Sequence, residues 1–141
     1  MVSEEIIKKL KVLREKEPPE AKDALTLFEI YKQIAQEEAD IKEELEDLEE
    51  IIVQNNFSDV GFKYWIKLGE GNFDVGEGEA EDPTVTMSAT AETWAGLGSG
   101  EIESTSAYMA GDLSIEGNLQ DAIAYGQILD LFRDVMEDLE E

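Results

Sequence analysis

The sequence predicts an α+β fold, in which helices pack on one face of a five-stranded, mainly antiparallel sheet. Apolar residues recur every three to four positions over residues 1–50, which is typical of amphipathic helices. The period changes to two at Ile51 and stays at two as far as Ser88. The helical period returns at Thr90 and is interrupted once more by a short alternating segment. Because helices precede and follow a run of strands, the pattern favours one layer of helices packed on one layer of sheet.

The N-terminal segment is expected to be a helix of its own. Its apolar residues have helical spacing, and the pair Pro18-Pro19 cannot continue a helix, so the segment ends there. We therefore divide the chain into an amphipathic helix with a Pro-Pro linker, residues 1–19, and a main domain, residues 20–141.

Two further helices are expected before the sheet. The apolar stripe predicts one helix over about 20–36 and another that begins near Asp40, where a dense acidic face starts. One unbroken helix over 20–50 fits the same pattern.

Four strands are expected between Ile51 and Ser88, over residues 51–57, 62–68, 73–79 and 84–88. The turn residues Glu70-Gly71-Asn72 predict a hairpin between the second and third strands. The second strand alternates strictly, which predicts one buried and one solvent-facing side. The buried side carries Phe62, Tyr64, Ile66 and Leu68, and the other side carries Lys63, Trp65 and Lys67.

The last third of the chain returns to helices. Thr90 can cap one short helix, and a second is expected over about 103–110. A fifth strand, residues 112–116, then lies between two glycines. Asn118 is the expected cap of a long closing helix.

The composition excludes several classes of chemistry. The chain has 141 residues, of which 42% are hydrophobic, so it is long enough for one domain with a core. It contains no Cys and no His, which excludes a thiolate nucleophile, an imidazole base and a nitrogen or sulfur zinc site. We therefore expect no metal, no cofactor and no enzymatic activity; catalysis would have to depend on carboxylates, hydroxyls and a few lysines.

The charge restricts the partners. The chain contains eleven Lys and Arg residues and 35 Asp and Glu residues. Its net charge of −24 repels nucleic acid. Residues 1–17 hold five bases and four acids, so the first helix is the part of the chain that an anionic membrane surface does not repel. We expect transient membrane contact there or packing on a protein surface. With no apolar run of about 20 residues and no signal-peptide pattern, we expect a soluble, cytoplasmic protein.

The large apolar residues are the candidate binding residues. They would form either a solid core or the wall of a tunnel between sheet and helices, since both use the same residue types. The set is Tyr64, Ile66, Leu68, Phe73, Val85, Met87, Trp94, Leu97, Tyr108, Met109, Leu113, Ile115, Ile123, Leu129 and Phe132.

Three motifs resemble those of the type-two sterol carrier proteins, the nonspecific lipid-transfer family. Residues 107–119 (AYMAGDLSIEGNL) are similar to the family signature, in which an aromatic residue and a glycine precede an L-x-I-x-G strand and a closing helix. Residues 82–88 (DPTVTMS) resemble its fourth strand, and residues 64–71 (YWIKLGEG) its second strand and turn. The likeness covers about residues 38–132.

The resemblance implies that residues 20–141 form a sterol-carrier-like lipid-binding domain. The family encloses an apolar tunnel between a five-stranded sheet and its helices, so the implied activity is a non-catalytic carrier of a fatty acid, sterol or isoprenoid-type lipid. The acidic surface favours neutral ligands over acyl-CoA. The alternative is a dimeric interaction or regulatory module with the same fold but a filled cavity, in which the first helix or Trp65 forms the contact between two copies.

Overall fold

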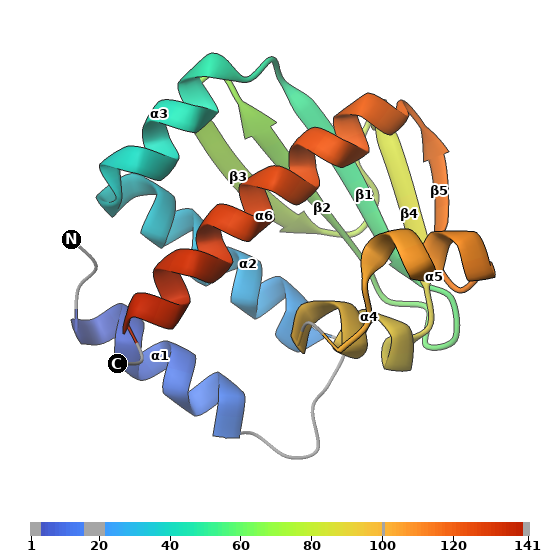
Figure 1. Ribbon diagram of the computed structural model, residues 1–141, viewed down its shortest axis with the longest axis horizontal. Coiled ribbons are helices and arrows are strands. Elements are labelled where there is room, and N and C mark those ends of the chain that lie inside the picture. Colours follow the sequence, from blue (N-terminus) through green and yellow to red (C-terminus); the bar gives the residue numbers. More distant parts are fainter. Residues whose placement is uncertain (1–3, 16–21, 100, 140–141) are drawn as a thin grey trace.

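The computed structural model describes residues 4–15, 22–99 and 101–139, and the expected Pro-Pro linker lies outside them. It confirms the α+β class (Figure 1). In chain order the elements are α1 (Glu4–Glu15), α2 (Lys22–Glu37), α3 (Ala39–Asp47), β1 (Ile51–Phe57), β2 (Lys63–Gly69), β3 (Asn72–Glu77), β4 (Val85–Ala89), α4 (Ala91–Ser99), α5 (Ser104–Ala110), β5 (Ser114–Gly117) and α6 (Leu119–Leu139).

The five strands form one sheet in the order β3-β2-β1-β4-β5. All neighbouring pairs are antiparallel except β1 and β4, which are parallel, so the expectation of a mainly antiparallel sheet is confirmed. The expected hairpin joins β2 to β3. Its two turn residues, Glu70 and Gly71, have φ angles of 54° and 84°, as a two-residue turn that matches strand twist requires.

The register places the buried apolar residues of β1 to β4 on one face of the sheet, with the partly buried Ile115 of β5 beside Met87. Val53 on the central strand β1 lies opposite Ile66 on β2 and Val85 on β4, and all three are fully buried. The helices α2, α3 and α6 contact this face, and Figure 1 shows α6 crossing it diagonally, with α4 and α5 beside the β4–β5 end. The predicted arrangement of helices on one face is thus confirmed.

Two helices, α2 and α3, occupy the segment for which one unbroken helix over 20–50 was the alternative. Glu38 has an extended backbone, which ends α2 and begins α3, although its N–H still donates to the Ile34 carbonyl at 2.8 Å. The alternative of an unbroken helix over 20–50 is therefore wrong. The helix α1 packs on α2 through the buried Ile6 and Leu10, while the division of the chain at residue 19 stays a prediction.

The fifth strand begins later than the sequence predicts, because its first two expected residues, Asp112 and Leu113, lie in the turn that closes α5. Gly111 adopts a left-handed conformation, with φ of 85°, and the N–H groups of Asp112 and Leu113 donate to the Ala107 carbonyl at 2.9 and 3.1 Å. The strand therefore begins at Ser114. The expected cap of α6 is confirmed, since the Asn118 side chain accepts from the N–H of Gln120 at 2.9 Å.

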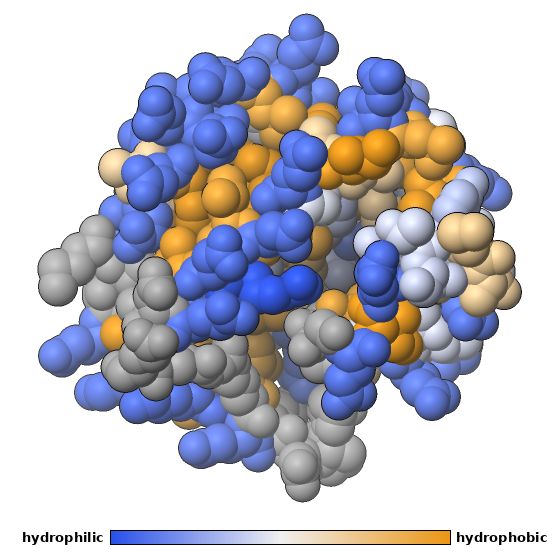
Figure 2. Space-filling model, in the orientation of Figure 1, coloured by the Kyte–Doolittle hydropathy of each residue, from blue (hydrophilic) through white to orange (hydrophobic). Residues whose placement is uncertain are grey.

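Acidic side chains dominate the surface outside the covered face of the sheet. Figure 2 shows hydrophilic residues over most of the helical side of the molecule, with apolar residues gathered along α6 and beside α4 and α5. This distribution agrees with a net charge of −24 and leaves the space between sheet and helices as the main apolar region.

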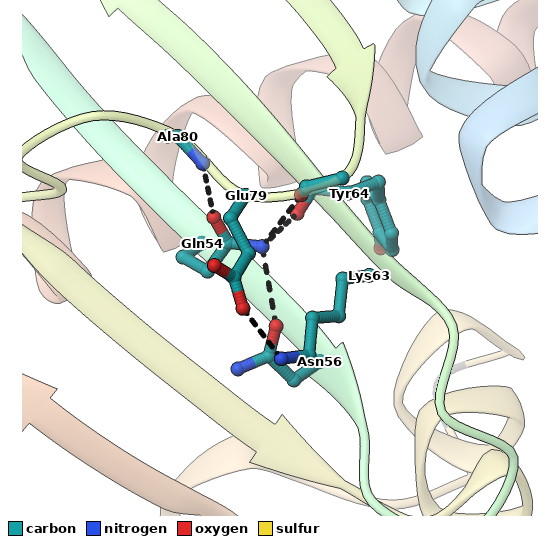
Figure 3. A network of polar contacts seen from close by, with 7 residues as sticks. Gln54, Asn56, Lys63, Tyr64, Glu79 and Ala80 are labelled. Atoms are coloured by element: carbon teal, nitrogen blue, oxygen red, sulfur yellow. Dashed lines mark hydrogen bonds and ion pairs between the residues drawn. The ribbon is translucent and has the colours of Figure 1, made fainter.

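The opposite face of the sheet is polar and is partly covered by the segment that follows β3. Gln54 lies on this face and is nevertheless buried, because its amide is surrounded by hydrogen-bond partners (Figure 3). Its Nε2 donates to the carbonyls of Tyr64 and Gly78 at 3.2 and 3.0 Å, and its Oε1 accepts from the N–H of Ala80 at 2.7 Å. Gln54 thereby fixes the start of the loop between β3 and β4 against the sheet.

Trp65 also lies on the polar face, where its indole ring packs directly over Gly76 of the neighbouring strand. The side chain is half-buried, so the sequence-based assignment of Trp65 to the side away from the helices holds. A glycine at the facing position leaves the room that the ring occupies.

We expect Gly76→Ala to lower the free energy of unfolding by about 1–2 kcal/mol, because the new Cβ would overlap the indole ring of Trp65. Gly126→Ala is the matched control: it lies within α6, has no atoms near its Cβ position, and should raise the free energy of unfolding by about 0.5–1 kcal/mol. Urea unfolding measures both. Equal effects of the two substitutions would contradict the packing of Trp65 on Gly76.

Candidate functional site

The structure brings most of the predicted binding residues into the layer between sheet and helices. Eight of them are buried: Tyr64, Ile66, Leu68, Phe73, Val85, Met87, Leu113 and Phe132. Four are partly buried and pack against the same cluster: Trp94, Leu97, Ile115 and Leu129. The remaining three lie at the surface: Tyr108, Met109 and Ile123. The candidate site therefore consists of an interior layer and an exposed apolar group on α5 and α6.

Aromatic rings fill the part of the layer under α6 and α2. Phe132 of α6 stacks on Tyr31 of α2, with ring centroids 4.5 Å apart and planes 7° from parallel. Phe132 also contacts Phe73 of β3, at 5.2 Å. The sequence places Tyr31 on a buried helical stripe, but the periodicity does not reveal which rings of the sheet or of α6 it meets.

A second aromatic group lies where α4 meets the end of β1. Phe57 contacts Phe62 and Trp94, with centroids 5.9 and 6.0 Å apart. The Trp94 Nε1–H donates to the Asn56 carbonyl at 3.0 Å, and the Arg133 guanidinium donates to the Leu97 carbonyl at 3.4 Å. These two bonds attach α4 to the sheet on one side and to α6 on the other.

One polar cluster interrupts the apolar layer. The Asn55 side chain is wholly buried on the inward face of β1, and its Nδ2 donates to the Tyr125 hydroxyl at 3.3 Å. Its Oδ1 has no hydrogen-bond partner among the described residues. The Tyr64 hydroxyl lies beside the same amide. Burial raises the pKa of the Tyr64 and Tyr125 hydroxyls well above their usual value, so both stay protonated.

Asn55 and Tyr125 are absent from the sequence-based candidate set. The available signal was the alternation of β1, in which Asn55 falls at an inward position between Val53 and Phe57. A buried polar residue at such a position needs a hydrogen-bond partner inside the protein. It therefore indicates a candidate site residue as clearly as the apolar residues around it do.

The basic side chains nearest the sheet face away from the interior. Lys63 and Lys67 lie on the polar face, where they pair with Glu79 at 2.6 Å and Glu50 at 3.7 Å. Arg133 pairs with an acid on its own helix, Asp130, at 3.6 Å. The candidate site is thus apolar, with hydroxyl and amide groups as its polar atoms.

Two depressions mark the helical side of the molecule. A pocket of about 290 Å³ lies between α3 and α6, outside the aromatic layer. It is lined by Glu44, Asp47, Leu48, Ala124, Gln127, Ile128 and Leu131. Figure 2 shows a second hollow between α6 and the α4–α5 pair, with apolar side chains on both sides of it. Tyr108, Met109 and Ile123 belong to the helices that border this second hollow.

The described residues contain neither a metal-binding cluster nor a membrane-spanning helix. No group of three or more acidic, His or Cys side chains is arranged to hold a metal ion within the described ranges. None of the described helices has the length and apolar character that crossing a membrane requires.

Solved structures with similar folds include several sterol carrier proteins. Sterol Carrier Protein 2 from Yarrowia lipolytica, in its apo form, matches with a TM-score of 0.57 and 19% identity, covering 73% of this chain and 86% of that one. A conserved protein from Thermus thermophilus, described as possibly a sterol carrier protein, matches with a TM-score of 0.54 and 21% identity, covering 77% and 82%. At these identities the likeness shows the fold.

Two further solved structures with a similar fold are a ubiquinone synthesis protein and part of a sulfatase. The ubiquinone synthesis protein UbiJ-SCP2 matches with a TM-score of 0.59 and 16% identity, covering 77% of this chain and 96% of that one. The stereoselective inverting sec-alkylsulfatase Pisa1 from Pseudomonas sp. matches with a TM-score of 0.57 and 16% identity. This chain spans 18% of the Pisa1 chain, and 13% of a double mutant of the same enzyme, so the shared fold is one part of a larger enzyme.

A search of curated proteins found no match. The model of the SCP-2 sterol transfer family matches residues 31–130, which is well over half of the chain and includes the whole sheet. The resemblance seen in the sequence motifs is therefore confirmed, and this chain belongs to the SCP-2 sterol transfer family.

Proposed function

We propose that this protein binds one apolar lipid between its sheet and its helices and releases it chemically unchanged. The observation that carries the proposal is the apolar layer that lies beneath α6 and adjoins a hollow bordered by exposed apolar side chains. Membership of the SCP-2 family supports it. A lipid would reach the layer through the hollow between α6 and the α4–α5 pair.

Burial of hydrocarbon supplies enough free energy for such binding. A fully buried 16-carbon chain contributes on the order of 12 kcal/mol at ~0.8 kcal/mol per methylene. Association and ordering of the chain cost several kcal/mol or more. A micromolar dissociation constant corresponds to about 8 kcal/mol, so the apolar layer accounts for useful affinity without a charged contact.

The charges favour a neutral ligand. Lys63 and Lys67 lie on the far face of the sheet and are engaged with acids, and the whole surface carries −24. The phosphates of acyl-CoA would approach this field against electrostatic repulsion. We therefore infer that the ligand is a sterol, an isoprenoid-type lipid or another neutral chain.

Membrane contact through α1 is a further part of the proposal. Lys8, Lys9 and Lys11 are exposed on this helix, while Ile6 and Leu10 hold its other side against the domain. An exposed basic helix surface lowers the repulsion between an acidic carrier and an anionic membrane from which it collects or delivers a lipid.

A second candidate function rests on the close packing of the rings. Tyr31 and Phe132 stack at 4.5 Å, and the pocket of about 290 Å³ lies outside the layer, between α3 and α6. Both observations favour a solid interior, and a chain with a filled interior would act as an interaction module instead, for example by binding a second copy of itself. Ligand binding and oligomeric state separate the two candidates.

We expect titration with a neutral fluorescent sterol or a fluorescent fatty acid to saturate at one lipid per chain, with a dissociation constant of about 10 μM or lower. Light scattering of the same samples gives the oligomeric state. A titration without saturation, together with a stable dimer, would contradict lipid carriage and support the interaction module.

The exposed apolar group should control uptake. We expect Met109→Glu and Ile123→Glu to weaken lipid binding about tenfold, because a charge on the helices that border the hollow disfavours passage and burial of hydrocarbon. These side chains are 81% and 63% exposed, so stability should change by about 0.5 kcal/mol or less. Val60→Glu, at a position 56% exposed in the β1–β2 turn, is the control and should bind lipid normally. Equal binding by all three variants would count against this route.

We expect Trp65→Ala to leave lipid affinity within about twofold of the wild type, because the indole lies on the face of the sheet away from the helices. The same titration measures it, with light scattering to detect any change in association. A large loss of lipid binding would mean that the ligand occupies the polar face instead.

A further inference from the structure

An amide side chain lies at the centre of the apolar face of the sheet. Asn55 pairs with Tyr64 of β2 and with Met87 of β4, and its neighbours on the same face of β1, Val53 and Phe57, are both buried. Its exposed fraction is 0%, so the side chain does not contact bulk solvent. An amide in such a place is costly unless its polar atoms find partners.

The hydrogen bonds of this amide are incomplete. Nδ2 donates to the Tyr125 hydroxyl at 3.3 Å, and Oδ1 has no partner among the described residues. Turning the amide about its terminal bond would exchange the two ends, and Tyr125 could then donate to the oxygen. In either orientation one end of the amide faces Tyr125 and the other end lacks a described partner.

Tyrosine hydroxyls complete the cluster. Tyr125 accepts a bond from Asn55 and still has its own proton to donate, and the Tyr64 hydroxyl lies beside the same amide. The ring of Phe28 packs against Tyr64 at 5.6 Å and against Tyr125 at 6.5 Å. A hydroxyl donor and an unpaired amide atom are therefore brought together within an otherwise aromatic surrounding.

We infer that Asn55, Tyr125 and Tyr64 form a polar anchor that binds the hydroxyl group of a neutral lipid alcohol, such as a sterol or a long-chain alcohol. The ligand O–H donates to Asn55 Oδ1, and the ligand oxygen accepts from a tyrosine hydroxyl. A hydroxyl fits because a single atom both donates and accepts. This inference rests on the proposed function and adds the chemistry of the head group to it.

Other head groups fit this anchor less well. An ionised carboxylate only accepts, so it leaves Asn55 Oδ1 unpaired. Burial of a negative charge is also unfavourable at this place, as the raised pKa values of Tyr64 and Tyr125 indicate. A methyl ether is only slightly larger than the alcohol. It accepts a hydrogen bond but has no proton to donate, so it cannot form the bond to Asn55 Oδ1.

The test compares 1-dodecanol with its methyl ether, by displacement of a pyrene-labelled hydrocarbon from the full chain. We expect the wild type to bind the alcohol about tenfold more tightly than the ether, because the ether leaves a buried acceptor unpaired. In Asn55→Leu the ratio should fall to about one, with the affinity for the ether unchanged or higher. Asn56→Leu is the matched control, since it is the same substitution at the next residue, on the opposite face of β1, and should keep the tenfold ratio.

The outcomes separate the anchor from the proposed function. Equal binding of alcohol and ether by the wild type would overturn the anchor and leave lipid carriage standing, as would a tenfold ratio that persists in Asn55→Leu. Failure of the wild type to bind the pyrene probe or either lipid would overturn the proposed function and the anchor with it. If Asn55→Leu does not fold, as circular dichroism would show, Tyr125→Phe removes the hydroxyl without changing the ring and should lower the ratio in the same direction.

Discussion

The burial of one continuous apolar face of the sheet is the constraint on which the rest of the molecule depends. Strand register aligns Val53, Ile66 and Val85 across three neighbouring strands, and none of them is more than 1% exposed. Such a face is stable in water only when another layer covers it. The helices α2, α3 and α6 contact it from one side, so every candidate binding residue of the sheet points toward them.

Charge is separated from this interior by the sheet itself. The opposite face carries Lys63, Lys67 and the buried amide of Gln54, and each has its polar partners there. Thus the polar atoms that point inward are uncharged, and their donors and acceptors are hydroxyl and amide groups such as those of Asn55 and Tyr125. The charges of the sheet thus lie away from the helices, and under the proposed function the inward polar contacts of a lipid would come from uncharged groups.

Much of the fold could be predicted from the sequence because its signals are local. The alternation over Ile51–Phe57 gives β1 with its observed bounds, and the cap residue Asn118 gives the start of α6. The candidate site was harder to predict from the sequence, because it depends on contacts between segments that are far apart in the chain. The stacking of Tyr31 on Phe132 and the bond from Asn55 to Tyr125 follow from how α2 and α6 cross the sheet, and no periodicity encodes that angle.

The two outer strands have a consequence for the behaviour of the protein at high concentration. An unpaired strand edge invites pairing with another chain, and this risk is greatest for sheets with long, flat and apolar borders. Here β5 contributes only four residues and carries Glu116, while β3 carries Asp74 and Glu77. Neighbouring copies therefore meet short, like-charged borders that repel each other, which should keep a chain rich in β-forming segments from assembling into fibrils.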